Sequence, residues 1–194
     1  EKLLKNIDKE IIIILDETYF GFMKINYDNR GLLIKQYPNL VVIRSFSKFY
    51  AIAGVRIGYL LAGDYARKKL KIHASYLGHN FIAEEIASML LDETKFYQSM
   101  RGELSKQREI LYDYFKYLKG FQVYKSVANF LLIRINSELY SSIEYKKYME
   151  EKGYLIKIFT EGRLKNCVRI AIPLKEHIQK IIELTNSFVI SKKQ

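Results

Sequence analysis

The chain has 194 residues and a formal net charge of +11, and 49% of its residues are hydrophobic while 27% are charged. This composition is typical of a soluble globular protein with a substantial core. No apolar run approaches the roughly 20 residues that cross a bilayer, which excludes a membrane-spanning helix and a membrane partner. The single cysteine, Cys167, excludes an internal disulfide and indicates a reducing compartment, so we expect a cytoplasmic protein.

The positive charge is spread along the chain rather than gathered in one motif. Lysine-rich stretches such as 66–71 and 144–154 fall on predicted helices, which is typical of solvated helix faces. No nucleic-acid-binding motif accompanies these lysines, so we expect no nucleic-acid partner and favour a small anionic ligand. The three histidines, His73, His79 and His177, follow no metal-ligand spacing, and we expect no metal site.

The first part of the chain alternates strand patterns with helical patterns. The continuous apolar runs "IIIIL" (11–15) and "LVVIRSF" (40–46) predict fully buried strands of the parallel type, and "RIGYLLA" (56–62) predicts a third strand. Helical patterns separate and follow these strands. The predicted helices are "KLLKNI" at the start, "NRGLLIKQYPN" ending before Pro38, 64–74 with Asp64 as its N-cap, and a helical region from Asn80 to about Leu118.

After Gly120 the pattern changes to shorter strands. The stretches "FQVYKS", "ANFLLIRI", "YLIKI" and "CVRIAI" predict four strands, with helices near 141–152 and 175–190. We therefore predict an α/β fold in which residues 1–115, including a linking helix, form part of a large domain with a mainly parallel sheet. Residues 116–194 form a small α+β domain. The chain begins without a methionine, and we interpret it as a piece of a longer protein.

Polar side chains follow the first two predicted strands directly. "DETY" (16–19) comes after the first strand, and "SFSK" (45–48) comes after the second. In open α/β sheets, ligands bind at the carboxyl ends of the strands. The sequence therefore predicts that an acid, a tyrosine, two serines and a lysine meet in one crevice.

The residue types in this crevice match one kind of ligand. Lys48 lies in a turn beside the apolar Phe46 and Phe49, which suits a lysine that forms a Schiff base with a carbonyl compound. Asp16 is placed to bind a cation or a protonated ring nitrogen.

A phosphate group would complete this set. Ser45, Ser47 and Arg56 offer two hydroxyl donors and a bidentate guanidinium, which together make a phosphate cradle. An aldehyde that needs a lysine, a ring nitrogen that needs a carboxylate and a phosphate together describe pyridoxal 5'-phosphate.

The blocks "DETYFGF", "SFSKFYAIAGVRIGYLLA", "SVANFLLIR" and "CVRIAI" resemble the second half of fold-type I, class I/II aminotransferases, with the histidinol-phosphate aminotransferases as the nearest type. The blocks follow the family's order across nearly the whole chain, and the S-x-S-K-x₇-R-x-G block is highly specific. The resemblance implies a pyridoxal-phosphate-dependent transaminase in a biosynthetic process. It also implies a small-molecule amino donor, a 2-oxo acid acceptor and a homodimer.

The resemblance also implies a role for each matching residue of the cofactor site. Lys48 would be the Schiff-base lysine and catalytic acid/base, Asp16 would pair with the pyridinium nitrogen, and Tyr19 would hydrogen-bond the cofactor's phenolic oxygen. The cofactor's phosphate would be held by Ser45, Ser47 and Arg56.

Three residues of the second half of the chain would bind the substrate. Arg169 would hold an acidic group of the substrate, and Asn129 occupies a family position near the domain junction. Lys157 stands where relatives of the histidinol-phosphate type usually have a second arginine. The family's other site residues, which include an asparagine, a phosphate loop and a ring-stacking aromatic, precede residue 1.

Two further functions remain open at this point. The segment "KFYAIAGVRIGY" also resembles threonine-phosphate decarboxylases, which share the fold and break a different bond at the substrate's α-carbon. An aminotransferase-like sensor domain of a transcription regulator would bind the cofactor without turnover and would carry a DNA-binding domain upstream. A plain nucleic-acid-binding module is the last alternative.

Overall fold

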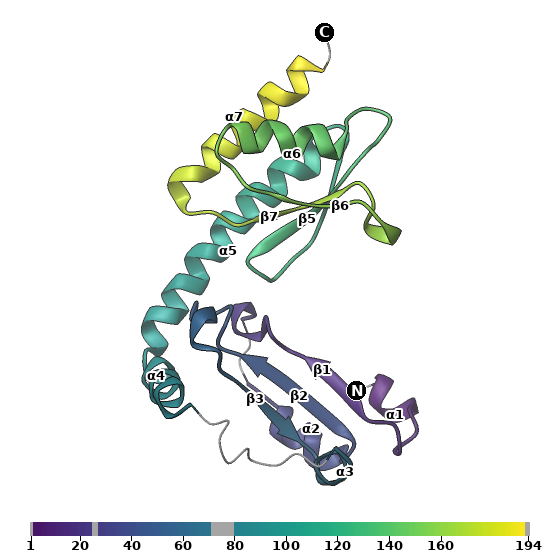
Figure 1. The fold of residues 1–194 in the computed structure, drawn as a ribbon, viewed down its shortest axis with the longest axis vertical. Helices are drawn as coiled ribbons and strands as arrows, with labels where there is room; N and C mark the ends of the chain where they lie inside the picture. Colours follow the sequence, from purple (N-terminus) through teal and green to yellow (C-terminus); the bar gives the residue numbers. More distant parts are fainter. Residues whose placement is uncertain (1, 25–26, 71–79, 193–194) are drawn as a thin grey trace. The chain divides into compact units, whose positions relative to one another are not determined.

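The computed structural model describes residues 2–24, 27–70 and 80–192 (Figure 1). The chain divides into two compact units, Glu1–Tyr97 and Gln98–Gln194. Each unit contains one sheet and its own helices. We describe the units separately.

The first unit is built on a three-stranded sheet of order β1-β2-β3. Strands β1 (Ile13–Asp16) and β2 (Leu40–Ser45) are parallel, as the sequence predicts. Strand β3 (Gly58–Ala62) runs antiparallel to β2, so the expectation of a mainly parallel sheet is wrong for the part of the sheet in this chain. A parallel return needs a crossover of a dozen or more residues, usually a helix. The β2–β3 connection, residues 46–57, contains the 3₁₀ turn Ala53–Val55 and no α-helix that could cross back over the sheet.

Burial differs between the strands of this sheet. The central strand β2 buries Leu40, Val41 and Val42 almost completely. In β1, however, Ile14 is 58% exposed and Leu15 is 39% exposed, so the prediction of a fully buried first strand is wrong here. Helix α2 (Arg30–Gln36) packs against β2 and β3, and β1 is an edge strand of this sheet by the strand order.

The helices of the first unit largely follow the predicted boundaries. Helix α2 ends before Pro38, and Asn80 caps α4 by accepting a hydrogen bond from the backbone N–H of Ala83 at 3.1 Å. Asp64 is not the N-cap of α3, because Gly63 holds that position and Asp64 lies in the first turn. The last part of the predicted helix 64–74 lies outside the described residues. The helices are α1 (Lys2–Asn6), α2, α3 (Asp64–Lys69) and α4 (Phe81–Asp92).

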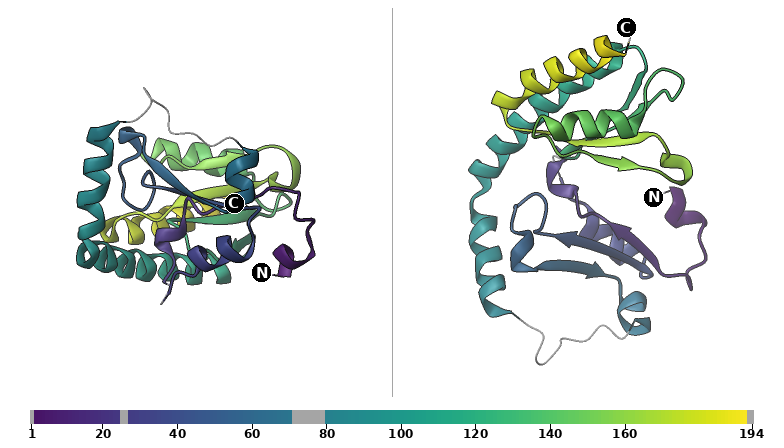
Figure 2. Two further views of the ribbon diagram at one scale, coloured as in Figure 1. Left: turned by 90° about the horizontal axis from the view of Figure 1, so that it is seen from below. Right: turned by 45° about the horizontal axis from the view of Figure 1, so that its top comes forward.

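The second unit is a four-stranded antiparallel sheet of order β4-β5-β7-β6 with helices on one face (Figure 2). Its four strands and two later helices confirm the pattern predicted after Gly120. Gly120 has a φ of +88°, which suits the turn between the preceding long helix and the first strand of this sheet. The elements are α5 (Thr94–Tyr117), β4 (Phe121–Tyr124), β5 (Phe130–Ile135), α6 (Ser142–Glu151), β6 (Lys157–Phe159), β7 (Cys167–Ala171) and α7 (Lys175–Ser191).

The long helix α5 belongs mostly to the second unit. Its residues Leu111 and Phe115 are fully buried, and they pack in one core with Leu131 and Ile133 of β5 and Phe188 of α7. The compact units therefore divide before most of this helix, whereas we expected the linking helix to close the large domain at residue 115. The domain boundary of the whole protein stays a prediction.

Among the described residues, no helix has the length and apolar character that crossing a membrane requires.

Two turns at the carboxyl ends of β1 and β2 pack against each other through aromatic rings. Phe22, in the 3₁₀ turn Phe20–Phe22, meets Phe49 edge-on with ring centroids 5.2 Å apart. Gly21 makes this contact possible, because a Cβ at that position would lie 2.3 Å from Cγ of Phe49. Phe49 is buried and cannot easily move away.

We expect Gly21→Ala to destabilise the first unit by about 1–3 kcal/mol, because the new methyl group overpacks a fixed ring. Gly31→Ala is the matched control, since no atom lies within 4 Å of a Cβ placed there. Chemical denaturation of the full-length protein measures both changes. Equal stability of the two variants would show that the turns do not pack in this way.

Candidate active site

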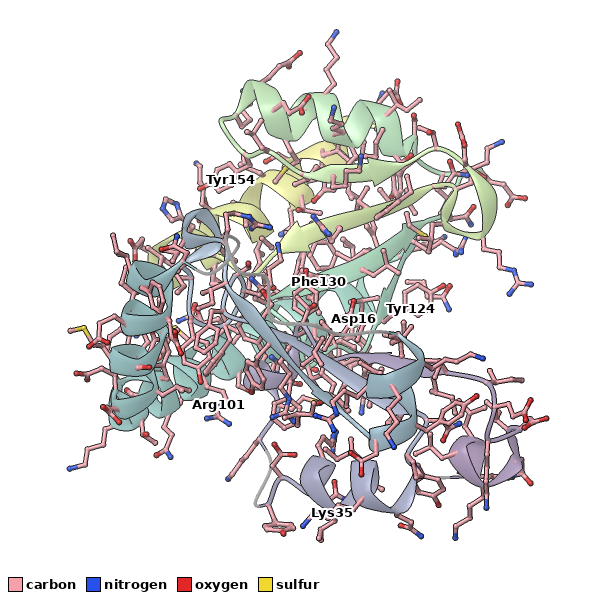
Figure 3. The ribbon with its side chains drawn as sticks, turned by 60° about the horizontal axis from the view of Figure 1, so that its bottom comes forward. Asp16, Lys35, Arg101, Tyr124, Phe130 and Tyr154 are labelled. Carbon is pink, nitrogen blue, oxygen red and sulfur yellow. The ribbon has the colours of Figure 1, made fainter. Side chains whose placement is uncertain are left out.

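The candidate site forms where β1 and β2 end side by side. Asp16 is paired in register with Ile43, and the backbone N–H of Glu17 donates to the carbonyl of Ile43 at 2.8 Å. The parallel pairing therefore continues one residue beyond β1. This register brings the "DETY" segment, with Asp16 labelled in Figure 3, to the same sheet edge as the "SFSK" turn.

The carboxylate of Asp16 is held in one orientation by the residue two positions later. Its Oδ1 atom accepts hydrogen bonds from the hydroxyl of Thr18 at 2.6 Å and from the backbone N–H of Thr18 at 2.9 Å. The hydroxyl bond, and after it the backbone bond, lowers the pKa of Asp16 below its ordinary value. The carboxylate is therefore ionised at neutral pH, and its other oxygen faces no hydrogen-bond donor among the residues that the structure describes.

Buried aromatic rings anchor the turn that carries Lys48. Phe46 and Phe49 are 4% and 5% exposed, while Lys48 between them is exposed. Inside the turn, the backbone N–H of Ser47 donates to Oγ of Ser45 at 3.0 Å. The fold thus fixes the backbone on both sides of Lys48 and leaves its amine accessible. Within the described ranges, no carboxylate lies at ion-pair distance from this amine.

The three residues of the predicted phosphate cradle line one hollow. Ser45, Ser47 and Arg56 surround it together with Gly58 of β3, and its volume is about 450 Å³. Gly58 allows β3 to approach β2 closely, because a Cβ there would lie 2.7 Å from the carbonyl oxygen of Arg44. The hollow has the donors and the room that a phosphate group needs.

Arg56 reaches this hollow from an unusual backbone conformation. Its φ and ψ are 60° and 55°, in the left-handed region, and its guanidinium donates to the carbonyl of Ala53 at 2.8 Å. A residue with a Cβ pays roughly 1–2 kcal/mol for this conformation, so a glycine would be the stable choice. Strain of this kind clusters at functional sites, which favours a binding role for the arginine side chain.

Tyr19 lies at the start of the 3₁₀ turn, with its ring centroid 6.1 Å from that of Phe22. It is half-buried and does not line the hollow around Arg56. Its predicted contact with the cofactor's phenolic oxygen stays a prediction.

A charged layer that the sequence analysis missed lies next to these residues. Glu17 is buried and forms ion pairs with Arg44 at 2.8 Å and with Arg30 at 2.6 Å, and Arg44 also pairs with Asp28 at 2.6 Å. Burial alone would lower the pKa of Arg44, but its hydrogen bonds to Asp28, Tyr59 and Glu17 outweigh burial and raise it. The only sequence signal was that Glu17 and Arg44 each adjoin a predicted site residue.

In the second unit, two of the predicted substrate residues are direct neighbours. Lys157 of β6 is paired in register with Arg169 of β7, and both side chains are exposed. Val168 and Ile170 on either side of Arg169 are buried in the core. Since side chains alternate along a strand, Arg169 and Lys157 lie on the sheet face opposite the core.

These two cations have no acidic partner within residues 98–192 as described. The guanidinium carbon of Arg169 lies 5.3 Å from the ring centroid of Phe130, a cation–π contact, and Lys157 forms no ion pair there. Two adjacent positive charges without a carboxylate suit an anionic group.

Asn129 lies in a loop that a buried arginine fixes. Arg108 of α5 donates to the carbonyl oxygens of Val127 and Ala128 at 3.1 and 3.2 Å. The carbonyl of Asn129 itself accepts from the backbone N–H of Ile172 at 2.9 Å. The Asn129 side chain is half-buried, and its role toward a substrate stays a prediction.

The parts of the chain that the structure describes hold no group of three or more potential metal ligands. His73 and His79 lie outside the described residues.

Comparison with known proteins places the chain in a family. The chain belongs to the class I and II aminotransferases, whose family pattern it matches over residues 1–183. It is 31% identical over 189 residues to the histidinol-phosphate aminotransferase of Bacillus cytotoxicus, and the match covers 96% of this chain and 50% of that protein. The resemblance drawn from the sequence blocks is therefore confirmed, and the chain spans about half the length of this curated relative.

Solved structures share the fold. The histidinol-phosphate aminotransferase of Sinorhizobium meliloti, solved in complex with pyridoxal-5'-phosphate, superposes with a TM-score of 0.81 at 19% identity, over 98% of this chain and 53% of that chain. The L-threonine-O-3-phosphate decarboxylase of Porphyromonas gingivalis gives a TM-score of 0.78 at 26% identity, over 97% and 57%. The α/β fold class is thus confirmed.

The strained backbone of Arg56 gives a matched pair of variants. Both Arg56→Gly and Arg56→Ala remove the guanidinium and its bond to Ala53, but only glycine relieves the left-handed conformation. We expect Arg56→Gly to be more stable than Arg56→Ala by about 1 kcal/mol in chemical denaturation of the cofactor-free protein. Both variants should bind pyridoxal 5'-phosphate more weakly than the parent. A glycine variant no more stable than the alanine variant would contradict the left-handed backbone.

Proposed function

We propose that this chain is part of a pyridoxal-phosphate-dependent aminotransferase of the histidinol-phosphate aminotransferase type. The enzyme would move the amino group of an amino-acid-like donor, including donors that carry a phosphate, to a 2-oxo acid. One observation carries the proposal: an ionised carboxylate at Asp16, an accessible amine at Lys48 and the hollow of Ser45, Ser47 and Arg56 belong to one sheet edge.

The residues of this edge fit the chemical groups of pyridoxal 5'-phosphate one by one. Asp16 would bind the ring nitrogen through its second oxygen, and the ionised carboxylate would keep that nitrogen protonated. The hollow would hold the phosphate, and Lys48 would bind at the aldehyde carbon. When bound, the cofactor supplies an electron sink for a bond broken at the substrate's α-carbon.

Lys48 is the group of this chain that would move a proton. Its Nζ atom would take the proton from the substrate's α-carbon, because the turn holds it accessible between two buried rings. The anchored backbone limits where the amine can reach, and this favours transfer at one carbon over reaction elsewhere. Tyr19 would donate its hydroxyl to the cofactor's phenolic oxygen.

Arg169 and Lys157 would hold the anionic end of the substrate. Their adjacent, unpaired charges match the two negative charges of a phosphate monoester better than the single charge of a carboxylate. A phosphorylated amine is also the substrate that the name of the Bacillus cytotoxicus relative implies for that protein.

A phosphorylated substrate also keeps a second function open. The Porphyromonas gingivalis relative is named for decarboxylation of a phosphorylated amino acid and shares the fold at 26% identity. The cation pair would bind either substrate, because it recognises the phosphate and not the bond that breaks. Family membership favours transamination. The homodimer and the cytoplasmic location implied by the resemblance and the composition remain part of this proposal.

Reduction with borohydride tests the assignment of Lys48. The full-length protein, loaded with pyridoxal 5'-phosphate and reduced, should carry the cofactor covalently on the peptide that contains Lys48, as mass spectrometry can show. Lys48→Ala should still bind the cofactor through the phosphate and ring contacts, but without the covalent label. Lys35→Ala, a change on the exposed side of helix α2, is the control and should label normally. A label on another lysine would refute the assignment.

Alanine variants of the cation pair test the substrate class. We expect Arg169→Ala to lose about 2–5 kcal/mol of transition-state binding, measured as kcat/KM, and Arg169→Lys to recover part of it. With histidinol phosphate or threonine phosphate, Lys157→Ala should also lower kcat/KM. With an unphosphorylated amino acid, Lys157→Ala should leave kcat/KM nearly unchanged. Scoring keto product against carbon dioxide separates transamination from decarboxylation. An unchanged kcat/KM for Arg169→Ala with all three substrates would remove this residue from the site.

A further inference from the structure

Arg44 and Glu17 form a buried fork at the junction of β1 and β2. Oε2 of Glu17 accepts hydrogen bonds from Nε and Nη2 of Arg44 at 2.9 and 2.8 Å, and the two side chains are only 6% and 9% exposed. The other oxygen of Glu17 accepts from Nε of Arg30 at 2.6 Å. The Glu17 carboxylate is therefore fully engaged, and its orientation is fixed.

The side chains of this fork and those of Asp16 and Ser45 leave opposite faces of the same two strand ends. Along a strand, successive side chains point to opposite faces, so Asp16 and Glu17 diverge, as do Arg44 and Ser45. The register with β3 follows the same alternation: Tyr59 is paired with Arg44 and accepts a hydrogen bond from it at 3.4 Å, and Gly58 is paired with Ser45. The hollow described above is lined in part by Arg44 and Tyr59 as well as by Ser45 and Gly58.

Arg44 also holds the turn that follows Glu17. Its guanidinium carbon lies 3.6 Å from the ring centroid of Phe20, and its Nη1 donates to Asp28 at 2.6 Å. Between Glu17 and Phe20 lie two residues, Thr18 and Tyr19. Thr18 is the residue that orients the Asp16 carboxylate. One guanidinium therefore fixes both ends of the segment that carries the predicted ring contacts.

Stability alone does not explain a buried ion pair at this position. Removing two charges from water is costly, and apolar side chains of similar volume often give equal or greater stability. A guanidinium that donates two hydrogen bonds to one carboxylate oxygen differs from an apolar pair because it fixes orientation as well as contact.

On this basis, and resting on the proposed function, we propose that Arg44 and Glu17 are positioning residues that hold Asp16 in register with the Lys48 turn from the opposite face of the sheet. Neither side chain touches the reacting atoms. Their effect reaches the cofactor through the backbone of the two strand ends, which the bond from Glu17 N–H to the Ile43 carbonyl joins.

The test uses the full-length, cofactor-loaded protein and five variants. Arg44→Met removes the fork but keeps the volume, Arg44→Lys keeps the charge without the planar fork, and Glu17→Gln retains the shape of the acid. Glu144→Gln is the control, because it breaks an ion pair of similar length, 2.9 Å, with Lys192 in the second unit. Asp16→Asn provides the reference for a lost contact to the ring nitrogen.

Three measurements are made on each protein: the pH midpoint of the cofactor's absorbance change, the rise in unfolding temperature on adding pyridoxal 5'-phosphate, and kcat separately from KM. We expect Arg44→Met and Glu17→Gln to move the absorbance midpoint in the direction of Asp16→Asn and to reduce the cofactor-induced rise. We also expect kcat to fall up to about a hundredfold, since small misplacements of reacting groups have effects of this size. KM should change little, and Arg44→Lys should recover only part of the loss.

The outcomes separate positioning from simple support of the fold. If Arg44→Met and Glu17→Gln lower only the unfolding temperature of the cofactor-free protein, with an unchanged midpoint and an unchanged cofactor-induced rise, the positioning role is refuted. If Arg44→Met does not fold, Glu17→Gln decides the question by the same criteria, because Arg44 then keeps Asp28 as a partner. A parent protein that binds no pyridoxal 5'-phosphate would overturn the proposed function itself, which a parent titration shows before any variant is compared.

Discussion

The parallel register of β1 and β2 is the constraint on which the candidate site depends. Asp16 ends the first strand and Ser45 ends the second, and the parallel pairing brings these two ends to one edge of the sheet. A slip of one residue would exchange the faces, so that Glu17 would point toward the cofactor side and Asp16 toward the charged layer. The main-chain bond to Ile43, the aromatic contact of Phe22 with Phe49 and the Arg44 fork all act against that slip.

The sequence predicted which residues meet at the ends of β1 and β2 because its signals were local. The residues after a strand can be read directly, and parallel neighbours present their carboxyl ends at one edge. This reasoning brought Ser45, Ser47 and Arg56 to one place, and the structure finds them around one hollow. The helices and strands of the second unit were also predictable, because α5 and α7 are long and periodic and Gly120 marks a clear end.

What the sequence did not predict depends on contacts between distant residues. The apolar pattern of β3 shows that it is a strand but carries no direction, and the connection from β2 lacks the helix that a parallel return usually needs. The burial of β1 depends on what packs beside it, and the apolar pattern of the strand itself carries no information about that neighbour. Glu17 and Arg44 are 27 residues apart, and their pairing becomes visible only once the register is known. The N-cap of α3 was assigned to Asp64 because aspartate is a common cap, but the chain enters the helix through Gly63.

The division of the chain into two compact units has a consequence for how such a protein can change over evolution. The residues proposed for the cofactor all belong to Glu1–Tyr97, and the cations proposed for the substrate all belong to Gln98–Gln194. The second unit has a core of its own, so substitutions on the open face of its sheet leave that core intact. Under the proposed function, substrate preference would drift by single substitutions at positions such as 157, while the residues that hold the cofactor are inherited unchanged.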